Sequence, residues 1–364
     1  MSVLMTVSDM SVGGAERMVA QLTVALHERG RETVVAAAPG PLDADLEAAG
    51  IERELLPRGS RSPLRAAAVV GALARVTARV SPELVHAHNP RIAASSAIAA
   101  RVGRPLARPP VLATFHGVLP SEYGVAARLL RLADHVVCVS AEIAHTLERS
   151  GVRGERLSVI PNAVEAVEPL NPERRAALDS ELGLGEAPVF SIVARLVPQK
   201  AHERFLEAAR IVAESHPETR FLIVGDGPLR AQMEGLAGEL NLGDQVLFTG
   251  VRADARDIIA RSRALVFSSN WEGLSVAALE ALSAGVPVVS TDVEGMREML
   301  GSGAGVMVGR DPAELAAAIT RLIERPDDAE QMGTIGRELA RTVYSPPAMA
   351  AAYDNLYDGL IAAR

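Results

Sequence analysis

Short apolar runs alternate with longer stretches of helical periodicity along the chain. Each run is rich in Val, Ile and Leu and lacks strict alternation of apolar and polar positions, which is typical of parallel strands covered on both faces. The predicted strands are 3–7, 33–38, 84–88, 111–115, 135–139 and 157–160, then 189–193, 221–224, 246–248, 264–267, 286–290 and 305–308. Between them, apolar residues recur at helical spacing, as in 15–29, 141–150, 202–214 and 275–284.

The strand–helix alternation occurs as two successive series, separated by a polar, proline-rich stretch at 161–187. Two such series predict an α/β fold of two doubly wound, Rossmann-like domains, and 364 residues are enough for two domains. We expect an N-terminal domain of residues 1–165 and a C-terminal domain of residues 166–345. The last segment, 346–364, has a helical pattern and is expected to pack back on the N-terminal domain.

Composition excludes several classes of protein. The hydrophobic set is 48% and charged residues are 23% of the chain, as in a packed globular protein rather than a disordered one. The net charge of −8 and the aromatic content of 3% argue against a nucleic-acid binder, which needs basic and base-stacking surfaces. The single cysteine, Cys138, excludes a disulfide framework and a cysteine-based metal cluster.

The charge is unevenly distributed between the halves. Residues 1–165 carry 18 basic and 16 acidic residues, whereas residues 166–364 carry 19 and 29. Segment 58–108 holds nine arginines and one acid, and a helix over 63–80 would present some of these arginines. One interpretation is that this face binds an anionic membrane surface. The alternative is that the arginines are simply exposed to water. With neither a signal peptide nor a membrane-spanning run, we expect a cytoplasmic protein, with peripheral contact at the inner face of the plasma membrane.

A candidate anion site follows the predicted strand 264–267. Gly273 breaks the chain there and a helix starts near residue 275, so its free N–H groups and positive dipole end would face an anion. Glu272 and Glu280 flank this point. On one helix, a spacing of eight residues gives a separation of about 12 Å, so the two carboxylates would contact different parts of one elongated ligand.

A second cluster follows the predicted strand 189–193. Arg195 and Lys200 lie five residues apart after that strand, and Lys200 is the only lysine among 37 basic residues. Two fixed cations suit a diphosphate, because each charge-assisted hydrogen bond contributes roughly 1.5–3 kcal/mol. A lysine delivers a compact charge where a guanidinium would be too wide.

These motifs together resemble the retaining GT-B glycosyltransferases of family 4 over essentially the whole chain. Arg195 and Lys200 match the Gly-Arg-Leu…Lys-Gly stretch, and Glu272 and Glu280 match the Glu-x7-Glu motif. Four more segments match in the family's order: the glycine-rich loop 13–17, the histidine segment 114–117, the Gly-x-Gly-Pro turn 225–228 and the short segment 249–251. Ala194 and Ala201 stand where the family usually has glycine, and this affects the expected donor preference.

The resemblance implies a fold and a site. The fold would be GT-B, two Rossmann-like domains facing each other across a cleft, with the nucleotide-sugar donor mostly on the C-terminal domain and the acceptor on the N-terminal domain. Catalytic roles would fall to Arg195, Lys200, Glu272 and His116. The donor would be contacted by Gly13, Gly14, Gly225, Gly250, Val251, Leu274, Ser275, Val276 and Glu280.

The implied roles follow the parts of the donor. Arg195 and Lys200 would hold the diphosphate with the amides of 274–276. Glu272 would meet the sugar hydroxyls and Glu280 the ribose. Residues 250–251 would contact the base, Gly13 and Gly14 would let the backbone approach the donor, and His116 would lie over the sugar.

The implied activity is hexosyl transfer from a nucleotide-diphosphate sugar to a hydroxyl acceptor, with retention of configuration and with neither metal nor cofactor. UDP is the nucleotide expected from the resemblance, and GDP is the alternative. The acceptor would be a lipid-linked saccharide of polysaccharide or glycolipid biosynthesis, or a small natural product. His86 and His88 form a metal-like pair, but no third ligand motif stands nearby. Two other functions remain open: a nucleotide-sugar epimerase on the same fold, and a non-catalytic sugar-nucleotide binding module.

Overall fold

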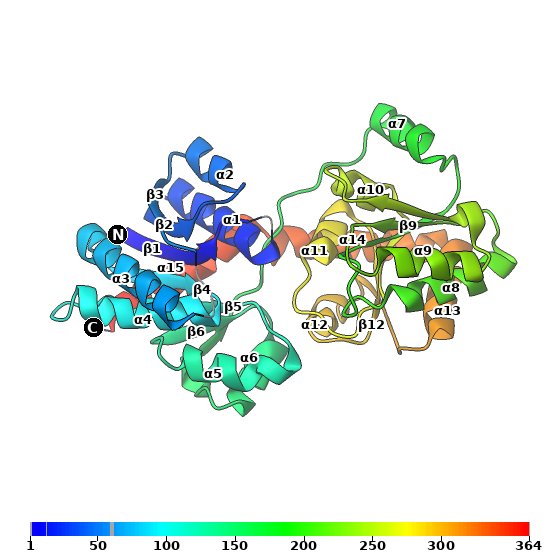
Figure 1. Cartoon of the computed structure of the whole chain (residues 1–364). Coiled ribbons are helices and arrows are strands. Elements are labelled where there is room, and N and C mark those ends of the chain that lie inside the picture. The colour runs from blue at the N-terminus through cyan, green and yellow to red at the C-terminus, as the bar shows by residue number, and fades with distance from the viewer. Residues whose placement is uncertain (1, 12, 59–61, 364) are drawn as a thin grey trace. The chain divides into compact units, whose positions relative to one another are not determined.

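The computed structural model describes residues 2–11, 13–58 and 62–363. The chain forms two compact units: unit 1 comprises Met1–Ala163 and Pro346–Arg364, and unit 2 comprises Val164–Ser345 (Figure 1). Arg61 of the Arg-rich segment and Arg364 at the end of the predicted terminal helix lie outside the described residues.

Unit 1 is built on a seven-stranded sheet in the order β3-β2-β1-β4-β5-β6-β7, and every strand pair is parallel. The central strands are buried on both faces, which explains their continuous apolar sequences. The strands are β1 (Ser2–Asp9), β2 (Glu32–Ala38), β3 (Glu52–Leu55), β4 (Leu84–His88), β5 (Val111–Phe115), β6 (His135–Cys138) and β7 (Leu157–Val159).

Helices cover the sheet of unit 1, and the last of them comes from the C-terminal end of the chain. The helices are α1 (Gly14–Glu28), α2 (Asp43–Ala48), α3 (Pro63–Val80), α4 (Pro90–Gly103), α5 (Tyr123–Leu130), α6 (Ala141–Arg149) and α15 (Pro346–Ala362). Helix α15, red in Figure 1, packs beside α1. Its Tyr353 and Tyr357 are fully buried in the same core cluster as residues of β1 and α1.

Unit 2 repeats this plan with a six-stranded parallel sheet in the order β10-β9-β8-β11-β12-β13. The strands are β8 (Val189–Val193), β9 (Arg220–Val224), β10 (Val246–Gly250), β11 (Ala264–Phe267), β12 (Val288–Thr291) and β13 (Gly305–Val308). The helices are α7 (Pro172–Leu182), α8 (His202–Ser215), α9 (Arg230–Glu239), α10 (Ala255–Arg261), α11 (Val276–Ala284), α12 (Met296–Leu300), α13 (Pro312–Glu324) and α14 (Pro326–Thr342).

Each sheet has one point where the strand order reverses. In unit 1 the reversal lies between β1 and β4, and in unit 2 it lies between β8 and β11. The loops that leave the carboxyl ends of such strands run in opposite directions, and the crevice between them is the usual ligand site of doubly wound sheets. In unit 2 these loops are residues 194–201, here called the β8 loop, and residues 268–275, the β11 loop.

Two elements of unit 1 were not predicted from the sequence. Strand β3 is an edge strand paired with β2, and three of its four residues are charged, so it gives no apolar signal. Helix α2 lies at residues 43–48, to which the sequence analysis assigned no element. Its Asp43 caps the backbone N–H of Gly40 at 3.1 Å and pairs with Arg53 at 2.6 Å, so the Asp-Ala-Asp sequence there has a structural role.

None of the helices described here combines the length and the apolar character that crossing a bilayer requires.

Candidate functional site

The β8 loop and the β11 loop bring two of the predicted site residues into direct contact. The Nζ of Lys200 lies 2.5 Å from Oε1 of Glu272, and the Oγ of Ser269 donates a hydrogen bond to the same oxygen at 2.5 Å. The Lys200 side chain is 17% exposed and that of Glu272 is 5% exposed. A cation and a carboxylate are therefore fixed together at the reversal point of the unit 2 sheet.

The β11 loop is tied to the end of strand β12 at this point. Thr291, the last residue of β12, donates a hydrogen bond from Oγ1 to the backbone oxygen of Ser269 at 2.7 Å. Ser269 is completely buried. Its hydroxyl therefore acts on Glu272 from a fixed position.

Arg195 lies on the β8 loop, five residues before Lys200, and is exposed. Its guanidinium has neither a hydrogen bond nor an ion pair within residues 2–11, 13–58 and 62–363. The structure thus joins Lys200 to Glu272 but leaves Arg195 free for an external anion.

The amides of Leu274, Ser275 and Val276 stand at the start of helix α11. Ser275 is the N-cap residue and makes no side-chain capping hydrogen bond. The three backbone N–H groups donate no backbone hydrogen bond to the described part of the chain. Because free N–H groups at a helix N-terminus attract anions, this end of α11 suits a phosphate.

Gly295 is packed against that same loop. It has φ +81°, and a Cβ at this position would lie 2.4 Å from the backbone oxygen of Gly273 and 3.0 Å from the nitrogen of Leu274. Only glycine fits here without moving the peptide that leads into the free amides.

Glu280 is on helix α11 and is buried, with 6% of its surface exposed. Its Oε1 accepts a hydrogen bond from Nε of Arg256 on α10 at 2.9 Å. Arg256 also pairs with Glu165 at 3.3 Å. The second carboxylate of the Glu-x7-Glu pair is therefore held by a cation that the sequence interpretation did not identify.

The turn after β9 lies directly against the β8 loop. Gly225 has φ +137°, and a Cβ there would be 2.1 Å from the backbone oxygen of Ala194. Its N–H donates to the oxygen of Gly250 at 2.8 Å, and Val251 is 80% exposed beyond it. Gly225 thus allows the carboxyl ends of β8, β9 and β10 to lie close together. The exposed apolar side chain of Val251 lies next to them.

Gly13 and Gly14 of unit 1 start helix α1, with Gly13 as the N-cap residue. The Glu16 carboxylate folds back over this end, because a Cβ on Gly13 would lie 2.2 Å from its Oε2. Burial raises the pKa of Glu16, and the hydrogen bond to its own backbone opposes this. An acid of the chain itself therefore covers this helix terminus.

His116 belongs to a row of three histidines in unit 1. Its ring stacks on His88 at 5.9 Å between centroids, and His88 lies 4.1 Å from His86. Burial lowers the pKa of His116 to about 4 and that of His86 to about 3, and it lowers the pKa of His88 as well. All three rings are therefore neutral at pH 7.

The partners of these rings differ. His86 is fully hydrogen-bonded, by Nδ1 to the hydroxyl of Tyr357 at 2.7 Å and by Nε2 to Thr114 at 2.6 Å. The buried ring nitrogens of His88 and His116, and Oδ1 of Asn162, make no hydrogen bond of ordinary geometry with the described residues, although Asn162 is close enough to His116 to oppose the effect of burial on its pKa. Unpaired buried polar atoms are costly, so this corner of unit 1 is able to receive polar groups of a ligand.

Several functional candidates were missing from the sequence interpretation. Ser269 donates a hydrogen bond to Glu272, and Arg256 pairs with Glu280. Asn162 has a buried side-chain oxygen that makes no hydrogen bond of ordinary geometry. Ser269 stands three residues before Glu272, and Asn162 follows Pro161 after the last strand of unit 1. Arg256 gave no local signal, because its partner Glu280 is 24 residues away.

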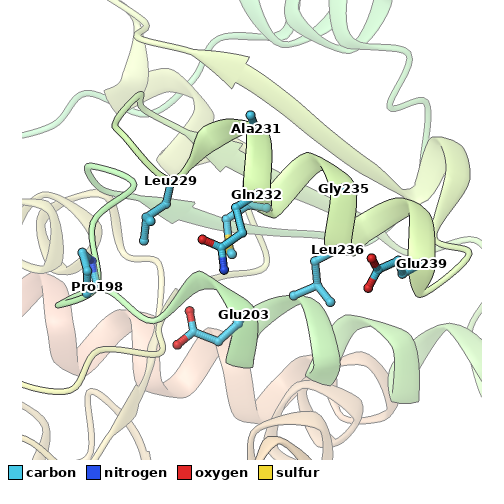
Figure 2. Close-up of a pocket in the computed structure, with 9 residues that line it drawn as sticks. Pro198, Glu203, Leu229, Ala231, Gln232, Gly235, Leu236 and Glu239 are labelled. Carbon is cyan, nitrogen blue, oxygen red and sulfur yellow. The ribbon is translucent and has the colours of Figure 1, made fainter.

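Two hollows lie beside these sites. In unit 1, a cavity of about 610 Å³ is lined by residues at the ends of β1 and β4, at the start of α4 and on α5, including Ser8, Asn89, Arg91 and Val125. In unit 2, a groove of about 660 Å³ runs between α8 and α9 (Figure 2). Leu229 and Leu236 enter it from α9 and its preceding turn, and Glu203 enters from α8. Its lining includes Pro198 but neither Lys200 nor Glu272.

Within residues 2–11, 13–58 and 62–363, no group of three or more His, Cys, Asp or Glu side chains is arranged to hold a metal ion.

Comparison with known proteins gives consistent results over both units. The family model "Glycosyl transferases group 1" matches residues 175–339, and the model "Glycosyltransferase Family 4" matches residues 12–168. The lipopolysaccharide core biosynthesis glycosyltransferase LpsD of Rhizobium meliloti (strain 1021) is 30% identical over 358 residues, 97% of each chain. The alpha-D-kanosaminyltransferase of Streptomyces kanamyceticus is 32% identical over 188 residues, 50% of this chain and 48% of that protein.

Solved structures share the fold over the full length. Anabaena HepE in complex with UDP superposes with a TM-score of 0.83 at 23% identity, covering 99% of this chain and 100% of that chain. WaaG, a glycosyltransferase involved in lipopolysaccharide biosynthesis, superposes with a TM-score of 0.76 at 18% identity, covering 98% and 99%.

Proposed function

The chain belongs to the group 1, family 4 glycosyltransferases and has the GT-B fold, and we propose that it transfers a hexosyl group from a UDP-sugar to a hydroxyl acceptor with retention of configuration. The observation that carries this proposal is the contact of Lys200 with Glu272 beside the free amides of α11. A cation, a carboxylate and amide donors are the groups that a sugar diphosphate requires.

In this proposal, unit 2 binds the donor. Arg195, Lys200 and the amides of 274–276 bind the diphosphate, and Glu272 accepts hydrogen bonds from the sugar hydroxyls. Glu280 accepts from the ribose, while Gly250 and Val251 contact the base. The UDP bound to the structural neighbour HepE supports the choice of nucleotide.

Unit 1 supplies the remaining contacts in this proposal. Gly13 and Gly14 allow close backbone approach, and the neutral His116 exchanges hydrogen bonds with hydroxyl groups of the sugar. The orphan ring nitrogens of His116 support this role.

The proposed step breaks the bond between the anomeric carbon and the phosphate oxygen. The acceptor oxygen forms the new bond on the same face of the sugar, and its proton passes to an oxygen of the departing diphosphate. Negative charge therefore accumulates on the diphosphate in the transition state, where Arg195, Lys200 and the helix terminus stabilise it. NMR of the product tests retention: an inverted anomeric configuration would refute it.

Metal independence is part of the proposal, because the two protein cations neutralise the leaving group. EDTA should leave the transfer rate unchanged, and adding Mg²⁺ or Mn²⁺ to the EDTA-treated enzyme should not raise it.

A donor screen followed by one substitution tests the function. Sugar nucleotides are incubated with the protein and products are identified by mass spectrometry. An epimerase would instead release UDP and an epimerised sugar without an acceptor, and a binding module would give no product. With the selected donor, Lys200→Ala should lower kcat/KM by at least about a hundredfold, whereas Arg210→Ala, on an exposed face of α8, should not. Unchanged turnover in Lys200→Ala would refute the assignment.

For the acceptor, we propose a lipid-linked saccharide of polysaccharide or glycolipid biosynthesis, bound at the unit 1 cavity next to Arg91 and Val125. The relative LpsD, named for lipopolysaccharide core biosynthesis, supports this class. A small natural product is the second class, since another relative is a kanosaminyltransferase. Transfer to a water-soluble saccharide but not to its lipid-linked form would overturn the first choice.

We further propose a cytoplasmic protein that contacts the inner face of the plasma membrane through α3. The first two turns of this helix are exposed, Leu64 to 84% of its surface, next to Arg65. Exposed apolar and basic side chains together favour anionic lipid. Co-sedimentation with vesicles containing anionic lipid, and not with zwitterionic vesicles, is the expected result; equal recovery in the supernatant with both would refute it.

A further inference from the structure

A dense set of hydrogen bonds joins the β8 loop to the β11 loop behind the Lys200–Glu272 pair. The hydroxyl of Ser268 donates to the backbone oxygen of Lys200 at 2.9 Å. The side-chain amide of Gln199 donates to the backbone oxygen of Trp271 at 3.0 Å. These contacts fix the backbone on both sides of the residues that meet the ligand.

Asn270 is the centre of this set. Its backbone N–H donates to the oxygen of Gln199 at 2.8 Å, and its Nδ2 donates to the oxygen of Pro198 at 3.0 Å. Its Oδ1 accepts from Nη2 of Arg204 at 3.2 Å, and its backbone oxygen accepts from Arg310 at 2.9 Å. Every polar group of Asn270 is therefore engaged, and two of its bonds cross directly between the loops.

Arg204 supports the β11 loop from the first turn of α8. Its Nη1 donates to the backbone oxygen of Ser268, its Nη2 donates to Asn270, and its Nε donates to the backbone oxygen of Arg310 at 2.8 Å. One planar guanidinium thus spans three acceptors, an arrangement that a lysine could not reproduce.

Partly burying the charged guanidinium of Arg204 costs free energy. All three acceptors of Arg204 are neutral oxygens, and burial lowers its pKa, although the charges of Glu203 and Glu207 oppose this effect. The three charge-assisted hydrogen bonds of Arg204 offset this cost. Its clear structural effect is geometric, because it fixes where residues 268–270 lie relative to α8.

The geometry matters because Lys200 and Glu272 emerge from the joined backbones. The side chain of Lys200 is long and flexible. The position of its ammonium group therefore depends on where the β8 loop places the backbone of Lys200. Displacement of a binding group by about 1 Å is enough to cost up to a hundredfold in rate. Sites therefore need supporting residues that hold the contacting groups to within about 0.5 Å.

We propose that Arg204 and Asn270 are positioning residues for the diphosphate, which hold the β8 and β11 loops so that Lys200, Glu272 and the amides of α11 act on one ligand. This proposal rests on the proposed function, since it assumes that the diphosphate binds at these groups. Neither residue needs to touch the donor.

The test compares two ligands that share the nucleoside. Affinities of the full-length protein for UDP and for uridine are measured by calorimetric titration, and the ratio of the two dissociation constants isolates the contribution of the diphosphate. Arg204→Met and Asn270→Ala should lower the UDP preference over uridine about tenfold, while uridine affinity stays unchanged. Arg204→Lys retains the charge but has a single donor nitrogen, and it should recover part of the preference.

One control variant and the use of an affinity ratio separate a positioning role from a structural one. Arg210→Met alters an exposed arginine of the same helix, paired with Glu214 at 2.7 Å, and should leave the preference unchanged. A variant that is merely less stable lowers the amount of folded protein but not the ratio of the two affinities. Wild-type ratios in both Arg204→Met and Asn270→Ala would overturn the proposal, and Asn270→Ala decides it if Arg204→Met does not fold.

Lys200→Ala distinguishes this failure from failure of the proposed function. If Lys200→Ala lowers the UDP preference but the positioning variants do not, only the positioning role is wrong. If Lys200→Ala has no effect, or if the wild-type protein binds neither UDP nor GDP, the diphosphate assignment itself fails. GDP and guanosine replace the uridine pair if the wild-type protein prefers guanine nucleotides.

Discussion

Gly295→Ala is the sharpest test of the amide site, because it moves the ligand-binding backbone without touching a charged residue. The new Cβ would lie 2.4 Å from the backbone oxygen of Gly273. An ordinary carbon–oxygen contact is about 3.3 Å or longer, so the Gly273 peptide has to move by roughly 0.9 Å. The amide of Leu274 belongs to this peptide and moves with it.

Two effects follow from this substitution. A side chain in the left-handed region costs roughly 1–2 kcal/mol of stability, and the overpacked contact adds roughly 1–3 kcal/mol. Loss of one charge-assisted hydrogen bond to the diphosphate, worth roughly 1.5–3 kcal/mol, would weaken UDP binding about tenfold to a hundredfold. Calorimetric titration with UDP and urea unfolding measure the two effects separately.

Gly183→Ala is the matched control. Gly183 has φ +64° at the C-cap of α7, with no atom within 4 Å of the position of a Cβ. Because of backbone strain, Gly183→Ala should therefore lose roughly 1–2 kcal/mol of stability but keep wild-type UDP affinity. If Gly295→Ala behaves as Gly183→Ala does, with unchanged UDP binding, the amides near Leu274 do not hold the diphosphate.

Three further predictions concern other parts of the chain. Burial lowers the pKa values of His86, His116 and His202 to about 3, 4 and 4. As the pH falls, these rings are therefore protonated in the unfolded chain at a higher pH than in the folded protein. Stability should fall as the pH drops below about 6.5, by roughly 1.4 kcal/mol per pH unit for each ring, until the folded rings titrate; equal urea midpoints at pH 7 and pH 5 would contradict this. Glu280→Met should abolish any preference for UDP over 2′-deoxy-UDP, measured by calorimetry, and a retained preference would exclude a ribose contact. Burial raises the pKa of the Cys138 thiol to about 12, so it should react with DTNB only in urea; a fast reaction in the native state would show that β6 opens.

Much of the fold was predictable because buried parallel strands have a clear apolar sequence. Strands β8, β11 and β13 have the predicted bounds, as does helix α3. Strand β3 was missed because Glu52, Arg53 and Glu54 at a sheet edge look like a loop. Local periodicity contains no information about such a strand, whose place is decided by pairing with β2.

The candidate site was predictable only where its residues form local motifs. Lys200 and Glu272 were both predicted, and the structure brings them together across 72 residues of sequence. Asn270 and Arg204 were not, although both lie within four residues of a predicted site residue. Their importance comes from bonds between two loops, and a single sequence does not show which backbone oxygens those loops present.

The position of α15 in the sequence determines which of the two units is completed first during translation. Unit 1 is discontinuous in sequence, and its core includes Tyr353 and Tyr357. Unit 2 is continuous, so it is fully synthesised while unit 1 still lacks its closing helix. The half of the protein that is translated first is therefore completed last, and until then a nascent chain exposes the apolar surface that α15 will cover.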